Sequence, residues 1–109
     1  MVQLKDGSQQ GVWKSNEIAI KHQYRMTSET LKFAGTIELV GGYKSFSRLA
    51  VYLLFLDNQG IVIEDTLIYS AANYRPLVAI PMDFDKTIPI PEGARIISFA
   101  YDINSVQGR

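Results

Sequence analysis

The longest uninterrupted apolar run of the chain spans residues 49–56 and reads Leu-Ala-Val-Tyr-Leu-Leu-Phe-Leu. Continuous apolar character alone does not distinguish a buried helix from a buried strand. The run is short, contains Val, Tyr and Phe, and is followed at once by the turn-forming segment 57–60, Asp-Asn-Gln-Gly, and these features favour a strand that enters a hairpin. Its length is also far below the roughly 20 apolar residues that a membrane-spanning helix requires. The sequence therefore predicts an interior β-strand and no membrane span.

The turn after this run predicts the register of the hairpin. Asp57 suits the first position of a type I turn, and Gly60 can adopt the left-handed conformation of a G1 bulge. This loop places Asp57 opposite Ile61, and the partner strand then follows from residue 61. Alternate residues from Leu49 to Phe55 form one apolar face, which we assign to the core.

The opposite face of the predicted hairpin is more apolar than a water-facing sheet surface usually is. An apolar patch of this kind commonly marks an interface. The candidate interface residues are Ala50, Tyr52, Leu54, Leu56, Val62 and Ile68, with Ile96 and Ala100 as further members.

The composition is that of one globular domain, residues 1–109. Hydrophobic residues make up 47% and charged residues 20% of the chain, and a chain of this length buries a core without help from a metal or a disulfide. Cysteine is absent, which excludes disulfides, thiolate catalysis and cysteine-based zinc sites without indicating a compartment.

The charge balance argues against a nucleic-acid partner. Eleven basic residues match eleven acidic ones, and the Lys/Arg cluster that nucleic-acid binding requires is missing. Residues 1–11 also lack the basic segment and apolar stretch of a signal peptide.

Apolar residues alternate with a period of two in several other segments, which predicts further strands. The predicted strands cover residues 18–26, 31–39, 77–84 and 94–102, with an extended segment at 87–91 after a turn at 85–86 and a loop at 70–76. Residues 1–12 and 104–109 are polar or glycine-containing, and we expect loose ends there, apart from a short edge strand at 2–4.

Two glycine positions affect how the second and third of these strands connect. A two-residue turn at Gly41-Gly42 would place the core-facing residues of one strand opposite the outward-facing residues of the next. Either Gly35 supplies a bulge that corrects the register, or residues 41–47 cross between two sheets; we favour the crossing.

Short strands with turn signals at roughly ten-residue spacing are typical of an antiparallel β-sandwich. The sequence thus predicts an all-β fold of two sheets and about seven strands, like immunoglobulin or fibronectin III domains.

The layout of residues 55–62, Phe-Leu-Asp-Asn-Gln-Gly-Ile-Val, and residues 90–94, Ile-Pro-Glu-Gly-Ala, resembles the small immunoglobulin-like or FxLYD-type modules of bacterial envelope proteins. The resemblance concerns the order of strand, turn and proline segment over about two thirds of the chain, and it implies no functional residue. It favours an extracytoplasmic location.

The ionisable residues give no catalytic or cofactor signature. His22, the only histidine, lies in the apolar phase of its strand, so we expect a packed, hydrogen-bonded side chain and not a catalytic one. Asp65 lies opposite Leu53 in the predicted register and faces the core; it requires a partner, a bulge that turns it outward, or a position near the end of the sandwich. The acidic turn residues lack calcium-loop spacing, and we expect no metal or cofactor.

The aromatic residues suggest a second binding mode. Trp13, Tyr43 and Tyr74 are candidates for a platform on which a sugar ring stacks, although Trp13 is better explained as a lid over the core. The sequence therefore favours a non-enzymatic module that binds a protein partner or a second copy of itself, with carbohydrate binding as the alternative.

Overall fold

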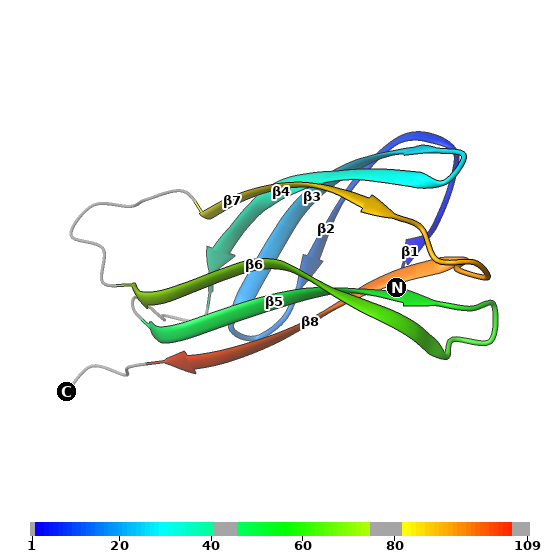
Figure 1. The fold of residues 1–109 in the computed structure, drawn as a ribbon. Coiled ribbons are helices and arrows are strands. Elements are labelled where there is room, and N and C mark those ends of the chain that lie inside the picture. The colour runs from blue at the N-terminus through cyan, green and yellow to red at the C-terminus, as the bar shows by residue number, and fades with distance from the viewer. Residues whose placement is uncertain (1, 41–45, 75–81, 106–109) are drawn as a thin grey trace.

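The computed structural model describes residues 2–40, 46–74 and 82–105. They form two layers of antiparallel strands (Figure 1). The strands are β1 (Val2–Gln3), β2 (Gly7–Lys14), β3 (Ile18–Thr27), β4 (Thr30–Leu39), β5 (Phe46–Leu56), β6 (Val62–Tyr74), β7 (Met82–Pro89) and β8 (Ile96–Ser105). The predicted all-β sandwich of two antiparallel sheets is confirmed.

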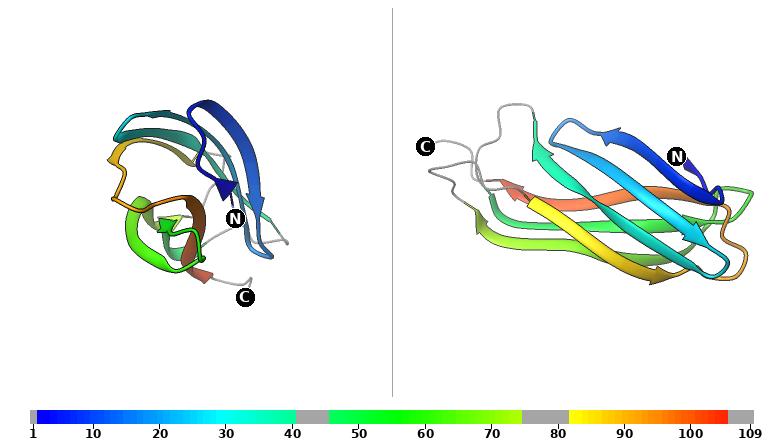
Figure 2. Two further views of the ribbon diagram at one scale, coloured as in Figure 1. Left: turned by 90° about the vertical axis from the view of Figure 1, so that its right-hand side faces the viewer. Right: turned by 90° about the horizontal axis from the view of Figure 1, so that it is seen from above.

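Each sheet contains four strands. Sheet A has the order β1-β8-β5-β6 and sheet B the order β2-β3-β4-β7, and Figure 2 shows the two layers along and across the strands. Three consecutive strands, β2 to β4, are neighbours in sheet B, whereas an immunoglobulin constant domain places its third strand in the other sheet. The chain shares the two-sheet architecture of such domains and connects these strands differently.

The core lies between the sheets and is formed by alternate residues of the inner strands. Leu49, Val51, Leu53 and Phe55 of β5 are fully buried, as predicted. Sheet B contributes the inward residues of β3 and β4, among them Ile20 and Phe33, both also fully buried. Because β5 and β3 each have a neighbour on both sides in their sheet, their inward side chains are covered on all sides.

The predicted crossing between sheets is confirmed. β4 ends at Leu39 in sheet B and β5 begins at Phe46 in sheet A; residues 41–45 lie outside the described residues. The pairing of β3 with β4 contains no register shift at Gly35. A Cβ atom at Gly35 would lie only 2.2 Å from the backbone oxygen of Lys21 and 2.8 Å from Cζ of Phe84, so this glycine permits a close approach and forms no bulge.

The N-terminal segment differs from the prediction. Residues 7–14, expected to lie largely within a loose end, form β2, which pairs with β3 from Gly7 opposite Met26 to Lys14 opposite Ala19. β2 lies at the edge of sheet B. Its polar side chains are tolerated because alternate residues of the strand face water. At the other terminus β8 extends to Ser105, and residues 106–109 lie outside the described residues.

Two further predicted boundaries are wrong. The strand β7 continues through Asp85 and Lys86, where a turn was predicted, and ends at Pro89. Backbone pairing with β4 from Ile37 to Thr30 keeps this segment extended. The strand β6 continues to Tyr74, beyond the predicted start of a loop at residue 70, because residues 70–72 and Tyr74 pair with β5. Residues 75–81, which include part of the predicted strand 77–84, lie outside the described residues.

The predicted loop between β5 and β6 is confirmed. The amide of Asp57 donates a 2.9 Å hydrogen bond to the carbonyl of Ile61, and Gly60 has the positive φ of +81° expected of a G1 bulge. The Asp57 carboxylate accepts hydrogen bonds of 2.8 and 3.0 Å from the amides of Gln59 and Ile61. The side chain that the sequence places first in the turn therefore stabilises the whole loop.

Beyond this loop the register departs from the prediction at two bulges. Phe55 lies opposite Glu64, because Ile63 is an extra residue between the pairs Leu56–Val62 and Phe55–Glu64. A second shift occurs between Val51 and Tyr52. A bulge changes which side chains of the strand face inward. These two bulges therefore determine which residues of β6 are exposed on the outer surface of sheet A.

Candidate binding surfaces

The outer face of sheet A carries part of the predicted interface. Ala50, Tyr52 and Leu54 are half-buried on β5, and Leu67 of β6 lies opposite Tyr52 with 47% of its surface exposed. The shielding of Tyr52 and Leu54 within one molecule is thus incomplete.

Two of the predicted interface residues are not exposed on this face. Ile68 is 1% exposed, because it is the extra residue of the second bulge and faces the core beside Tyr69. Leu56 is 5% exposed; its carbonyl accepts a hydrogen bond from the amide of Arg95, so the chain before β8 runs beside it. The expectation that both are exposed is wrong.

Exposed apolar side chains are concentrated on the second half of the hairpin. Among the described residues, five large apolar side chains are strongly exposed, and four of them, Ile61, Val62, Ile63 and Leu67, lie within seven consecutive positions. Only Val62 of these four was predicted as an interface residue. The period-two pattern places Ile61, Ile63 and Leu67 on the core face. Ile61 is exposed although it keeps its predicted position opposite Asp57. Ile63 and Leu67 are displaced by the bulges, which leave no signal in the sequence. We call Tyr52, Leu54, Ile61, Val62, Ile63 and Leu67 the hairpin surface.

The same shift in register resolves the position of Asp65. It lies opposite Leu54 instead of Leu53 and is exposed. The sequence allowed a partner, a bulge or a position near the end of the sandwich for this carboxylate, and the structure shows the bulge.

The three aromatic candidates do not form a described platform. Trp13 is partly buried, with ring centroids 5.6 Å from Phe99 and 6.0 Å from Tyr101. It therefore packs over the core, as the lid interpretation predicts. Tyr43 and the side chain of Tyr74 lie outside the described residues.

His22 is packed among aromatic rings. Its ring centroid lies 5.1 Å from that of Phe99 and 5.7 Å from that of Phe33, and burial lowers its pKa below the ordinary value of 6.5. Gly11 lies opposite it on β2, where a Cβ would approach the imidazole to 3.1 Å. Packing was predicted correctly, but neither ring nitrogen has a hydrogen-bond partner among the described residues.

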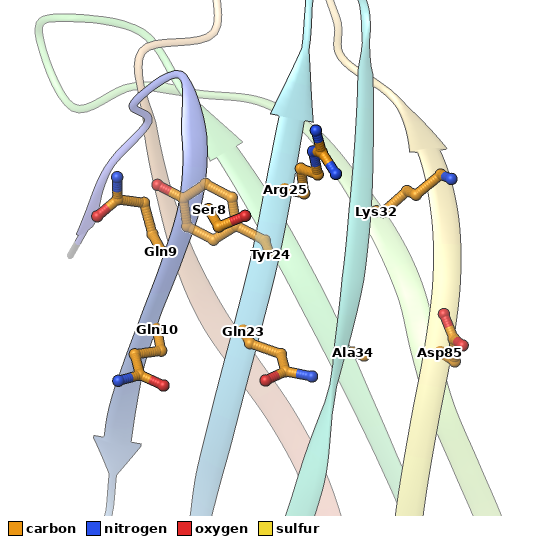
Figure 3. Close-up of a pocket in the computed structure, with 9 residues that line it drawn as sticks. All are labelled: Ser8, Gln9, Gln10, Gln23, Tyr24, Arg25, Lys32, Ala34 and Asp85. Carbon is orange, nitrogen blue, oxygen red and sulfur yellow. The ribbon is translucent and has the colours of Figure 1, made fainter.

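The outer face of sheet B is hollowed. A depression of about 510 Å³ is lined by residues of all four strands, and Figure 3 shows them. These are Ser8, Gln9, Gln10, Gln23, Tyr24, Arg25, Lys32, Ala34 and Asp85. An adjoining depression of about 730 Å³ shares Gln10, Gln23, Ala34 and Asp85 with it, so the two form one shallow trough across the sheet. We call it the sheet B trough.

The polar side chains of the trough differ in their partners. At one end Thr36 donates a 2.7 Å hydrogen bond to Asp83, and Lys21 lies 3.2 Å from the carboxylate of Glu38. At the other end Arg25 and Lys32 lie opposite each other on β3 and β4. The sequence pattern identifies these as outward residues of two strands but does not show that the neighbouring strands align them around a hollow.

Among the residues at 2–40, 46–74 and 82–105, no group of three or more His, Cys, Asp or Glu side chains is arranged to hold a metal ion. The same residues contain no helix that is long and apolar enough to cross a membrane.

Comparison of the chain with models of protein families, with curated proteins and with solved structures gave no match. The resemblance to FxLYD-type modules stays a prediction.

Proposed function

We propose that this protein is a non-enzymatic contact module that associates with a second copy of itself through the hairpin surface. The observation that carries the proposal is the concentration of exposed apolar side chains at Ile61, Val62, Ile63 and Leu67. Removing apolar surface from water contributes roughly 25 cal/mol per Å², and clustered exposure of this kind is typical of interaction sites.

The charges of the chain favour a second copy as the partner. The formal net charge is zero, so two copies do not repel each other at long range, and proteins near zero net charge associate most readily. Glu64 and Asp65 lie between Ile63 and Leu67 on the edge strand β6. Pairing two β6 edges side by side would bring these carboxylates together, which is unfavourable. The proposal is a contact between outer faces, with Tyr52, Leu54 and Leu67 at its centre; Asp65, opposite Leu54 on the edge strand β6, faces the same way and lies at the rim of this contact.

The alternative function has less support. A carbohydrate site built on exposed aromatic rings would use Trp13, Tyr43 and Tyr74, but Trp13 packs against Phe99 and Tyr101. The hairpin surface needs no aromatic platform to act.

Light scattering on purified protein tests the proposal. We expect the wild-type chain to approach twice its mass of 12.2 kDa as its concentration rises, and we expect Leu67→Glu and Leu54→Glu to stay at the monomer mass. The matched control is Val12→Glu, which places the same charge at an exposed apolar residue of β2 and is expected to associate like the wild type. Circular dichroism checks that each variant is folded.

A wild-type chain that keeps the monomer mass at every concentration would overturn self-association. Equal loss of association in Val12→Glu would show that the contact does not lie on the hairpin surface.

A further inference from the structure

The sheet B trough holds two cations that are paired with no carboxylate among the described residues, although Asp85 lies in the same hollow. Arg25 and Lys32 are directly opposite in the register of β3 and β4, and neither makes an ion pair or a side-chain hydrogen bond with any described residue. Like charges in opposite positions of a sheet destabilise it. The exposed pair Lys21–Glu38 on the same sheet has complementary charges in contact, so the unmatched pair is a local feature of this face.

The residues beside these two cations offer hydrogen bonds. Gln10 and Gln23 lie opposite each other on β2 and β3, and their amide groups both donate and accept. Ala34 continues this row on β4, and Asp85 ends it on β7. Figure 3 shows the glutamines side by side, with Arg25 and Lys32 in the next row of the sheet and Asp85 beyond Ala34.

The shape of the trough suits an extended ligand. The short side chain of Ala34 lies between longer polar side chains and leaves the hollow over the centre of the sheet. Four strands spaced about 4.8 Å apart give it a width of roughly 14 Å. A small ion would fill one end only, whereas a chain of linked rings would reach from the cations to the glutamines.

From these observations we infer that the sheet B trough binds an acidic saccharide chain, with a sugar carboxylate or sulfate held by Arg25 and Lys32. The planar guanidinium of Arg25 matches such an anion with two parallel hydrogen bonds, and Lys32 adds a point charge. The amides of Gln10 and Gln23 and the carboxylate of Asp85 bind hydroxyl groups of the adjoining sugars. The described part of this face presents no exposed aromatic ring, so the sugars are held by polar groups and not by stacking on a ring.

This site is independent of the hairpin surface. The trough lies on the outer face of sheet B and the hairpin surface on sheet A, so a failure of self-association would leave the saccharide site untouched.

A titration followed by two-dimensional ¹H–¹⁵N NMR tests the inference. The probes are an oligogalacturonate, a neutral glucose oligomer of the same length, and inorganic phosphate. We expect saturable shifts of the Gln23, Arg25 and Ala34 amides with the oligogalacturonate, and affinities for the other two probes that are lower by about tenfold or more.

Two double variants locate the binding. Arg25→Gln/Lys32→Gln is expected to reduce the affinity for oligogalacturonate by about tenfold or more, and Gln10→Ala/Gln23→Ala by a smaller factor. The control Lys5→Gln/Lys14→Gln removes the same charge from two exposed lysines and is expected to bind like the wild type. The amide spectrum of each variant shows whether it is folded.

Three results would overturn the inference. They are an absence of saturable shifts with oligogalacturonate, equal binding by Arg25→Gln/Lys32→Gln and the control, and phosphate binding as tight as that of the oligogalacturonate. The last would reduce the trough to a site for small anions.

Discussion

Among the described residues His22 is the one buried polar side chain, and its surroundings make it sensitive to acid. Phe33 and Phe99 lie against its ring. Protonation would place a charge among aromatic rings with no acceptor for either N–H group among the described residues, which is why burial lowers its pKa.

This environment predicts that stability falls as the pH falls. The folded-state pKa of His22 lies below 6.5, so the unfolded chain takes up the proton first. The contribution of the neutral histidine is fully present above pH 6.5 and is lost below it, by at most about 1.4 kcal/mol per pH unit, until the folded-state pKa is reached. Urea denaturation across this range measures the effect, and we expect His22→Leu to abolish this part of the pH dependence. A variant with an unchanged pH profile would show that the imidazole is not responsible.

Gly11 and Gly35 lie opposite His22 on the two neighbouring strands, and they differ in how much room they leave for a side chain. Gly35→Ala is expected to lower the free energy of unfolding by about 1–3 kcal/mol or more, because its new methyl group would overlap the backbone of Lys21 and the ring of Phe84. Gly11→Ala is the comparison: its methyl would meet the movable ring of His22 at 3.1 Å, so the loss should be smaller. Thermal denaturation of both variants decides, and equal losses would contradict the account.

At the scale of elements, the β5–β6 hairpin depends on one loop side chain. We expect Asp57→Ala to lower the free energy of unfolding by roughly 1–2 kcal/mol, because two loop amides lose their acceptor. The neighbouring Asn58→Ala, at an exposed position of the same turn, is expected to have little effect. Chemical denaturation of both variants is the measurement, and similar values for the two would refute the role given to the carboxylate.

The elements also show what the sequence could and could not predict. The core strand at 49–56, the Asp57 loop and the crossing after Leu39 follow from apolar continuity, turn chemistry and parity, and each is confirmed. The edge strand β2 was missed because its backbone pairing with β3, and not its composition, makes it a strand. The bulges at Ile63 and Ile68 were missed because one extra residue changes the register without changing the pattern.

That failure carries over to the candidate surfaces. Tyr52 and Leu54 were correctly placed on the outer face, but the bulges exchange Ile68 for Leu67 there. The sheet B trough could not be predicted at all, since it requires knowing which residues of four strands lie in adjacent rows.

At the scale of the whole molecule, the two sheets present opposite kinds of outer face. Sheet A exposes four large apolar side chains of the β5–β6 hairpin, whereas sheet B is hollowed and mostly polar, with Val12 as its one strongly exposed large apolar side chain among the described residues. The exposed apolar side chains of sheet A are the physical basis for proposing a second copy there. The second face stays free for a ligand in such an assembly.

The most direct test of this account is a dilution series followed by methyl NMR. The side-chain methyl signals of Leu54 and Leu67 are expected to shift together as the protein concentration rises, while those of Val12, exposed on β2, stay constant. Constant signals from Leu54 and Leu67 over the whole series, or a shift at Val12 in their place, would contradict the account.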